Sequence, residues 1–136
     1  MVIRTVWGDN LPAEVPSYPA IDIAQQLPSE VDAVLISKDM LYQAQEDTIL
    51  KLQLQSVARQ TILLIYGAMT RDIANILEIQ IPNVTDTTAR IVLVAVWDKD
   101  PVPMAGAMLI PIEPKTDFNF SREVDNWVRT FQKYDK

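Results

Sequence analysis

The sequence predicts a three-layer α/β sandwich in which helices cover both faces of a mainly parallel, five-stranded sheet. Short, nearly continuous apolar runs alternate with segments of helical periodicity along the chain. Such apolar runs are typical of strands that are buried on both faces, as in a parallel sheet. The chain has 136 residues, of which 49% are hydrophobic. We therefore expect residues 1–136 to form a single domain, either as a whole protein or as a piece excised from a longer one.

Five segments have the length and composition of strands, and turn-forming residues such as Gly8 and Gly67 follow some of them. They are Val2–Trp7, Val31–Ser37, Thr61–Tyr66, Arg90–Trp97 and Ala107–Ile112. The segment Arg90–Trp97 has the strongest strand pattern. Between the first two strands, Leu11–Pro19 contains three prolines, which predicts an irregular loop.

Four segments have the spacing of helices: Ala20–Leu27, Leu41–Arg59, a segment that begins at Thr70, and Phe120–Lys133. The first is at most about two turns long and stops at Pro28. The second also alternates in part like a strand, but it is long and rich in residues that favour helix. In the last, an apolar stripe faces the core, and Asn119 or Ser121 can cap its start.

Composition excludes several classes of function. The chain has no cysteine and no histidine, which removes thiol nucleophiles, zinc–thiolate sites and the commonest general base near neutral pH. The net charge of −6 argues against binding to nucleic acid or to an anionic membrane surface. No secretory signal and no apolar run of membrane-spanning length is visible. We expect a cytoplasmic protein with no cofactor.

The residues that follow the strands offer one possible catalytic site. The three glycines form no phosphate-binding loop, and no nucleophile motif is present. Asp9, Asp39 and Asp98 each follow a predicted strand, so in a parallel sheet they could meet at one edge and hold Mg²⁺. Turn formation alone accounts for all three aspartates, and we expect that simpler role.

An apolar connection near the last strand offers an interaction surface. Val102, Met104 and Met108 lie in the segment 101–108, where Pro101 and Pro103 forbid regular helix. Apolar side chains in such a loop are hard to bury fully, and an exposed apolar patch often marks a contact with another protein or with a second copy. The alternative is that this loop folds over the sheet edge and completes the core.

Several strand ends resemble those of response-regulator receiver domains, but in degenerate form. Ser37 stands where the phospho-accepting aspartate would be, Tyr66 replaces the switch threonine or serine, and Ile110 replaces the lysine. Trp7 and Gly8 replace the usual acidic pair. A second alignment places the phospho-site at Tyr66. The resemblance implies a flavodoxin-like pseudo-receiver, similar to the atypical receivers of pilus-assembly localisation ATPases.

We therefore expect a non-catalytic regulatory domain that binds another protein or a second copy of itself, independently of phosphorylation. One alternative is a Mg²⁺-dependent, phosphate-handling enzyme that uses the strand-end aspartates. Another is a small structural subunit of a larger assembly.

Overall fold

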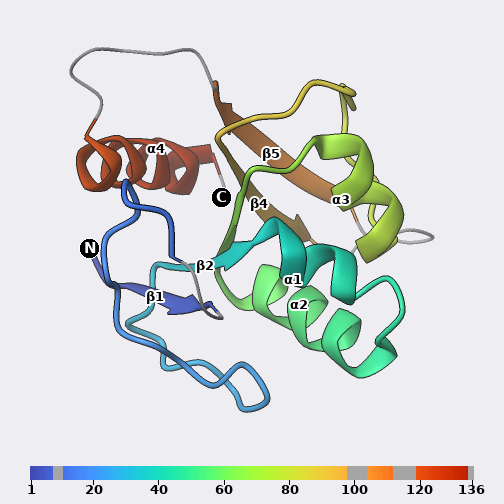
Figure 1. Ribbon diagram of the computed structural model, residues 1–136, viewed down its shortest axis with the longest axis horizontal. Coiled ribbons are helices and arrows are strands. Elements are labelled where there is room, and N and C mark those ends of the chain that lie inside the picture. The colour runs from blue at the N-terminus through green and yellow to red at the C-terminus, as the bar shows by residue number, and fades with distance from the viewer. Residues whose placement is uncertain (8–10, 98–103, 112–118, 135–136) are drawn as a thin grey trace.

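In the computed structural model, five strands form one open sheet in the order β1-β2-β3-β4-β5 (Figure 1). The structure describes residues 1–7, 11–97, 104–111 and 119–134, without the side chains of Trp97, Met104 and Tyr134. The strands are β1 (Ile3–Val6), β2 (Ala33–Ser37), β3 (Ile62–Tyr66), β4 (Ile91–Trp97) and β5 (Met104–Ile110). The helices are α1 (Lys38–Gln43), α2 (Thr48–Gln60), α3 (Thr70–Leu77) and α4 (Phe120–Tyr134).

The sheet is mixed, so the prediction of a mainly parallel sheet is wrong. β1, β2 and β3 run parallel, whereas β4 is antiparallel to both β3 and β5. A strand that is buried on both faces has the same continuous apolar sequence in either direction, which is why the pattern did not reveal the reversal. The order also differs from the flavodoxin-like order, in which the first strand lies between the second and the third.

Alternating side chains of the central strands enter two separate cores. In one row across the sheet, Leu35 pairs with Leu64 and Leu64 with Leu93, and all three are fully buried in the core under α4. Their neighbours along the strands, such as Ile36 and Ile65, point to the other face and pack under α1, α2 and α3. Figure 1 shows α4 on one side of the sheet and the other three helices on the opposite side. The predicted three-layer arrangement is therefore confirmed.

Residues 20–27, predicted as a helix, are irregular instead. Ala20 forms an isolated bridge with Thr5, and the Asp22 side chain accepts a hydrogen bond from the Ala24 backbone N–H (2.9 Å). Ile23 and Leu27 are buried, so their spacing reflects anchoring to the core and not a helical face. With Pro19 and Pro28 at its ends, the segment is too short for helix nucleation to be favourable.

The long helix predicted over Leu41–Arg59 is divided into α1 and α2. Asp47 divides it, because its carboxylate accepts a hydrogen bond from the Leu50 backbone N–H (3.1 Å) and caps α2. Asn119 caps α4 in the same way, as predicted. Thr70 does not cap α3: its buried hydroxyl accepts a hydrogen bond from the Thr85 backbone N–H (2.8 Å).

The last strand begins earlier than predicted, at Met104 instead of Ala107. The segment 104–106 was expected to belong to a connection, but its backbone pairs with β4 from Trp97↔Met104 onward. No helix among the described residues has the length and apolar composition needed to cross a membrane.

Truncation of one buried side chain in each core tests the strand assignment. Leu93→Ala and Ile36→Ala each remove a fully buried side chain, one from each core, and each should lower the free energy of unfolding by about 2–5 kcal/mol. Urea denaturation measures the change. Leu52→Ala, at a position that is 59% exposed, is the matched control and should change stability by less than about 0.5 kcal/mol. Unchanged stability of either core variant would contradict the strand assignment.

Candidate functional site

The carboxyl ends of β1, β2 and β3 meet at one end of the sheet, where ligands bind in many α/β proteins. We call this end of the sheet the carboxyl edge. Because β4 is antiparallel, this edge receives the start of β4 and not its end: Tyr66 pairs with Ile91, and Arg90 comes directly before it. The end of β4, at Trp97, pairs with Met104 at the opposite edge. The edge therefore carries Trp7, Ser37, Tyr66 and Arg90.

Of the three predicted metal ligands, the structure describes Asp39 alone. Asp39 lies in the first turn of α1 and is exposed. Asp9 and Asp98 lie outside the described residues. Over the described ranges, no group of three His, Cys, Asp or Glu residues could hold a metal ion. Because β4 is antiparallel to β3, the carboxyl end of β4 does not lie beside the carboxyl ends of β2 and β3.

An aromatic cluster occupies the carboxyl edge. The Tyr66 ring lies edge-on to Trp7, with ring centroids 5.7 Å apart, and 6.1 Å from the ring of Phe120 at the start of α4. Phe120 in turn contacts Tyr18, at 6.5 Å, in the proline-rich loop. Aromatic pairs at these separations add stability beyond their burial. The cluster joins β1, β3, α4 and the loop, which gives Trp7 a packing role.

A polar group at the rim of this cluster controls the Tyr66 hydroxyl. The hydroxyl donates a hydrogen bond to the Glu14 carboxylate, which also lies 3.8 Å from the Arg90 guanidinium. Burial, together with the hydrogen bond and negative charge of Glu14, raises the pKa of Tyr66 to about 12, while Arg90 opposes the shift. Tyr66 therefore keeps its proton at neutral pH, which suits a structural hydrogen-bond donor and not a general base.

Tyr18 is also held in its neutral form. Burial raises the pKa of its hydroxyl, and the charge of Asp125 adds to this, while Ser121 acts in the opposite direction. Although Ser121 lies near this hydroxyl, no partner among the described residues makes a hydrogen bond of good geometry with it. Neither tyrosine offers an ionised oxygen at neutral pH.

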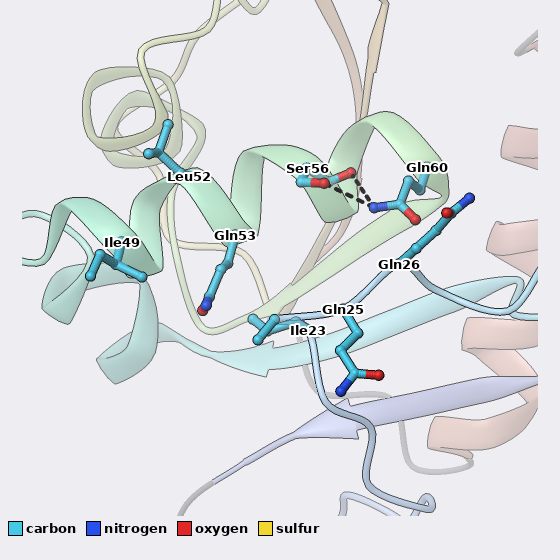
Figure 2. Close-up of a pocket in the computed structure, with 9 residues that line it drawn as sticks. Ile23, Gln25, Gln26, Ile49, Leu52, Gln53, Ser56 and Gln60 are labelled. Atoms are coloured by element: carbon cyan, nitrogen blue, oxygen red, sulfur yellow. Dashed lines mark hydrogen bonds between the residues drawn. The ribbon is translucent and has the colours of Figure 1, made fainter.

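A hollow in the described part of the surface lies elsewhere, between α2 and residues 23–26 (Figure 2). It encloses about 570 Å³. We call it the α2 groove; it is lined by Ile23, Ala24, Gln25, Gln26, Ile49, Leu52, Gln53, Ser56 and Gln60. None of these side chains is charged. Ile49 and Leu52 are 70% and 59% exposed, the highest values among the large apolar side chains of the described residues.

Helical spacing places the α2 side of the groove on one stripe. Residues 49, 52, 53, 56 and 60 are three, four, seven and eleven positions apart from the first, so they lie on one face of the helix. Gln60 fastens the opposite wall, because its side-chain oxygen accepts a hydrogen bond from the Leu27 backbone N–H (2.9 Å). Its amide nitrogen donates to the Ser56 hydroxyl (2.9 Å). Figure 2 shows this bond near the C-terminal end of α2.

The α2 groove was not predicted from the sequence. The available signal was the pair Ile49 and Leu52, which fall beside, and not within, the stripe of Leu50, Leu54 and Val57 that packs on the sheet. The facing wall gave no signal, because residues 23–26 were predicted as a helix and are irregular.

The predicted interaction residues are only partly described. Val102 and the side chain of Met104 lie outside the described residues. Met108 lies in the middle of β5 and is partly buried against the core under α4. It therefore belongs to an edge strand of the sheet, and not to an irregular loop.

Comparison with known proteins found no matching family model, no matching curated protein and no matching solved structure. The chemistry of the described surfaces therefore carries the functional argument.

The alkaline behaviour of Tyr66 tests the polar group. Its folded pKa of about 12 exceeds the unfolded value of 10.0, so the folded state holds this proton more tightly. The stability that Tyr66 contributes is present below pH 10 and is lost as the pH rises to about 12. Subtracting the ultraviolet phenolate titration of Tyr66→Phe from that of the unmodified protein should leave a step near pH 12, which belongs to Tyr66.

Glu14→Gln is the matched variant for this titration. It removes the charge but not the burial, so the late step should move toward pH 10 without reaching it. A difference titration with its step at pH 10 would contradict the assignment.

Proposed function

We propose that this chain is a non-catalytic protein-interaction domain that holds an apolar segment of a partner protein in the α2 groove. The exposure of Ile49 and Leu52 beside an uncharged hollow is the observation that carries the proposal. Contiguous exposed apolar side chains rimmed by polar ones often mark contact sites. At the carboxyl edge, by comparison, the described residues include two tyrosines that stay protonated, Tyr18 and Tyr66, and one exposed aspartate, Asp39.

The lining of the groove defines the chemistry of its occupant. Since no charged side chain lines it, a charged ligand would lose hydration without gaining a counter-charge. The exposed side chains of Ile49 and Leu52 favour an apolar contact. The amides of Gln25, Gln26 and Gln53 can donate and accept hydrogen bonds at the borders of the groove. An uncharged segment with an apolar face fits these properties.

The dimensions of the groove favour a helical occupant. The stripe from residue 49 to residue 60 spans about 16 Å at 1.5 Å per residue, which is about three helical turns. An amphipathic helix that lies along α2 would present apolar side chains at positions i, i+3, i+4 and i+7. We therefore propose a short amphipathic helix of another protein, with few charges on its contact face.

The resemblance to receivers adds a regulatory role without phosphorylation to this proposal. Ser37 and Tyr66 occupy positions that carry the chemistry of a receiver. Here the Ser37 hydroxyl caps α1 by accepting a hydrogen bond from the Met40 backbone N–H (3.2 Å), and the Tyr66 hydroxyl donates one to Glu14. Ile110 is buried. These side chains supply no carboxylate nucleophile and no lysine.

A receiver that accepts a phosphoryl group becomes phosphorylated itself, which is directly measurable. Incubation with acetyl phosphate and Mg²⁺, followed by intact mass measurement, should show no added phosphate, because Ser37 offers no carboxylate. An acid-labile phosphate adduct on Asp39 or Asp9 would overturn the non-catalytic proposal.

Peptide selection tests the groove. A random peptide library displayed on phage is selected against the immobilised protein and then against Ile49→Lys/Leu52→Lys. We expect peptides with apolar residues at helical spacing and few charges. Their binding should fall at least about tenfold in the double variant, because a buried lysine charge opposes an apolar contact. Lys51→Ala is the matched control: it changes the same helix outside the groove and should leave binding unchanged. Selected peptides that bind both proteins equally would contradict the proposal.

A further inference from the structure

The two outer strands of the sheet, β1 and β5, differ in how far other segments cover their outward backbone groups. At the β1 edge, Thr5 donates a backbone hydrogen bond to the Pro19 carbonyl (2.9 Å) and accepts one from Ile21 (3.0 Å). The segment 19–21 therefore covers β1, and Pro19 cannot extend the pairing. This is a usual means of keeping an edge strand from joining another chain.

At the β5 edge, the part of the chain that the structure describes covers only the start of the strand. The Ala105 N–H donates to the Gln80 carbonyl (2.9 Å), on the side away from β4. The direction of backbone groups alternates along a strand, so the N–H and C=O of Ala107 and Leu109 also point away from β4. Among the described residues, neither has a backbone partner on that side. The intervening Met108 instead pairs with Leu93 of β4.

The chemistry of β5 does nothing to discourage pairing. Its sequence, Met-Ala-Gly-Ala-Met-Leu-Ile, has no charge and no proline. The stretch 106–109 is partly exposed. Edge strands usually carry a lysine, a proline or a bulge that blocks another strand, and β5 has neither of the first two. An open, neutral and apolar edge strand is a template for adding a strand.

We propose that β5 pairs antiparallel with β5 of a second copy, around a two-fold axis at Met108. In this register Ala107 faces Leu109 of the second copy, and the reverse pair follows by symmetry. Each pair exchanges both backbone hydrogen bonds, so every open group on Ala107 and Leu109 is satisfied. Met108 faces its own counterpart. Pairing centred on Ala107 would need the Ala105 N–H, which Gln80 occupies, and pairing centred on Leu109 would need Pro111, which has no N–H.

The self-complementarity of this register favours a second copy over an unrelated strand. The surface is distinct from the α2 groove, so its test is independent of the proposed function. The contact itself is uncharged, but each copy carries a net charge of −6. Long-range repulsion therefore opposes association at low ionic strength, and added salt should strengthen the dimer.

A charge-swap experiment tests the axis at Met108. Sedimentation velocity over a range of concentrations should show a monomer–dimer equilibrium for the unmodified protein. Met108→Lys and Met108→Glu each place like charges face to face and should be monomeric over the same range. An equimolar mixture of the two should dimerise again. Leu52→Lys, in the α2 groove, is the matched control and should associate like the unmodified protein. A monomer at all concentrations, or no recovery in the mixture of folded variants, would overturn the proposal.

Amide hydrogen exchange of the unmodified protein gives a second test that needs no variant. The Ala107 and Leu109 amides should exchange at least about tenfold more slowly at concentrations where the dimer forms. The Met108 amide bonds to β4 in either state and should not respond. Dimerisation without slower exchange at Ala107 and Leu109 would show that another surface is used and would overturn the proposal.

Discussion

The direction of β4 decides which residues lie at each end of the sheet and which strand lies at its edge. β4 is buried on both faces and runs antiparallel to both of its neighbours. Because it starts where β3 ends, Arg90 joins Tyr66 and Glu14 at the carboxyl edge, and β4 ends with Trp97 at the opposite end of the sheet. The same reversal leaves β5 as the outer strand. The residues gathered at the carboxyl edge and the outer position of β5 therefore have one physical cause.

Much of the fold was predictable, because burial on two faces leaves a direct trace in sequence. The runs that contain Leu35, Leu64 and Leu93 were all recognised as strands, and they form one buried row. Direction leaves no such trace, since an apolar run has the same composition either way. One signal was available: residues 98–106 are too few for the crossover of a dozen or more residues that a parallel connection requires.

The surfaces were less predictable than the core. The α2 groove depends on residues 23–26, whose irregular path is held by long-range contacts such as that between Leu27 and Gln60, and local periodicity cannot report these. Met108 was selected as an interaction residue because its segment is apolar. In the structure Met108 belongs to an edge strand. The backbone groups of this strand are more available for contacts than its side chains are. Both surfaces are uncharged although the chain carries a net charge of −6, which suits binding to other proteins.

The direction of β4 can be measured without reference to any partner. Antiparallel strands bring the Hα atoms of non-hydrogen-bonded pairs close together, and parallel strands do not. Gly67 donates its backbone N–H to the Arg90 carbonyl, so Leu64↔Leu93 and Tyr66↔Ile91 are the non-hydrogen-bonded pairs of β3 and β4. A nuclear Overhauser spectrum of the protein should show strong Hα–Hα contacts for both pairs. Their absence, with contacts typical of a parallel ladder between β3 and β4, would contradict this account.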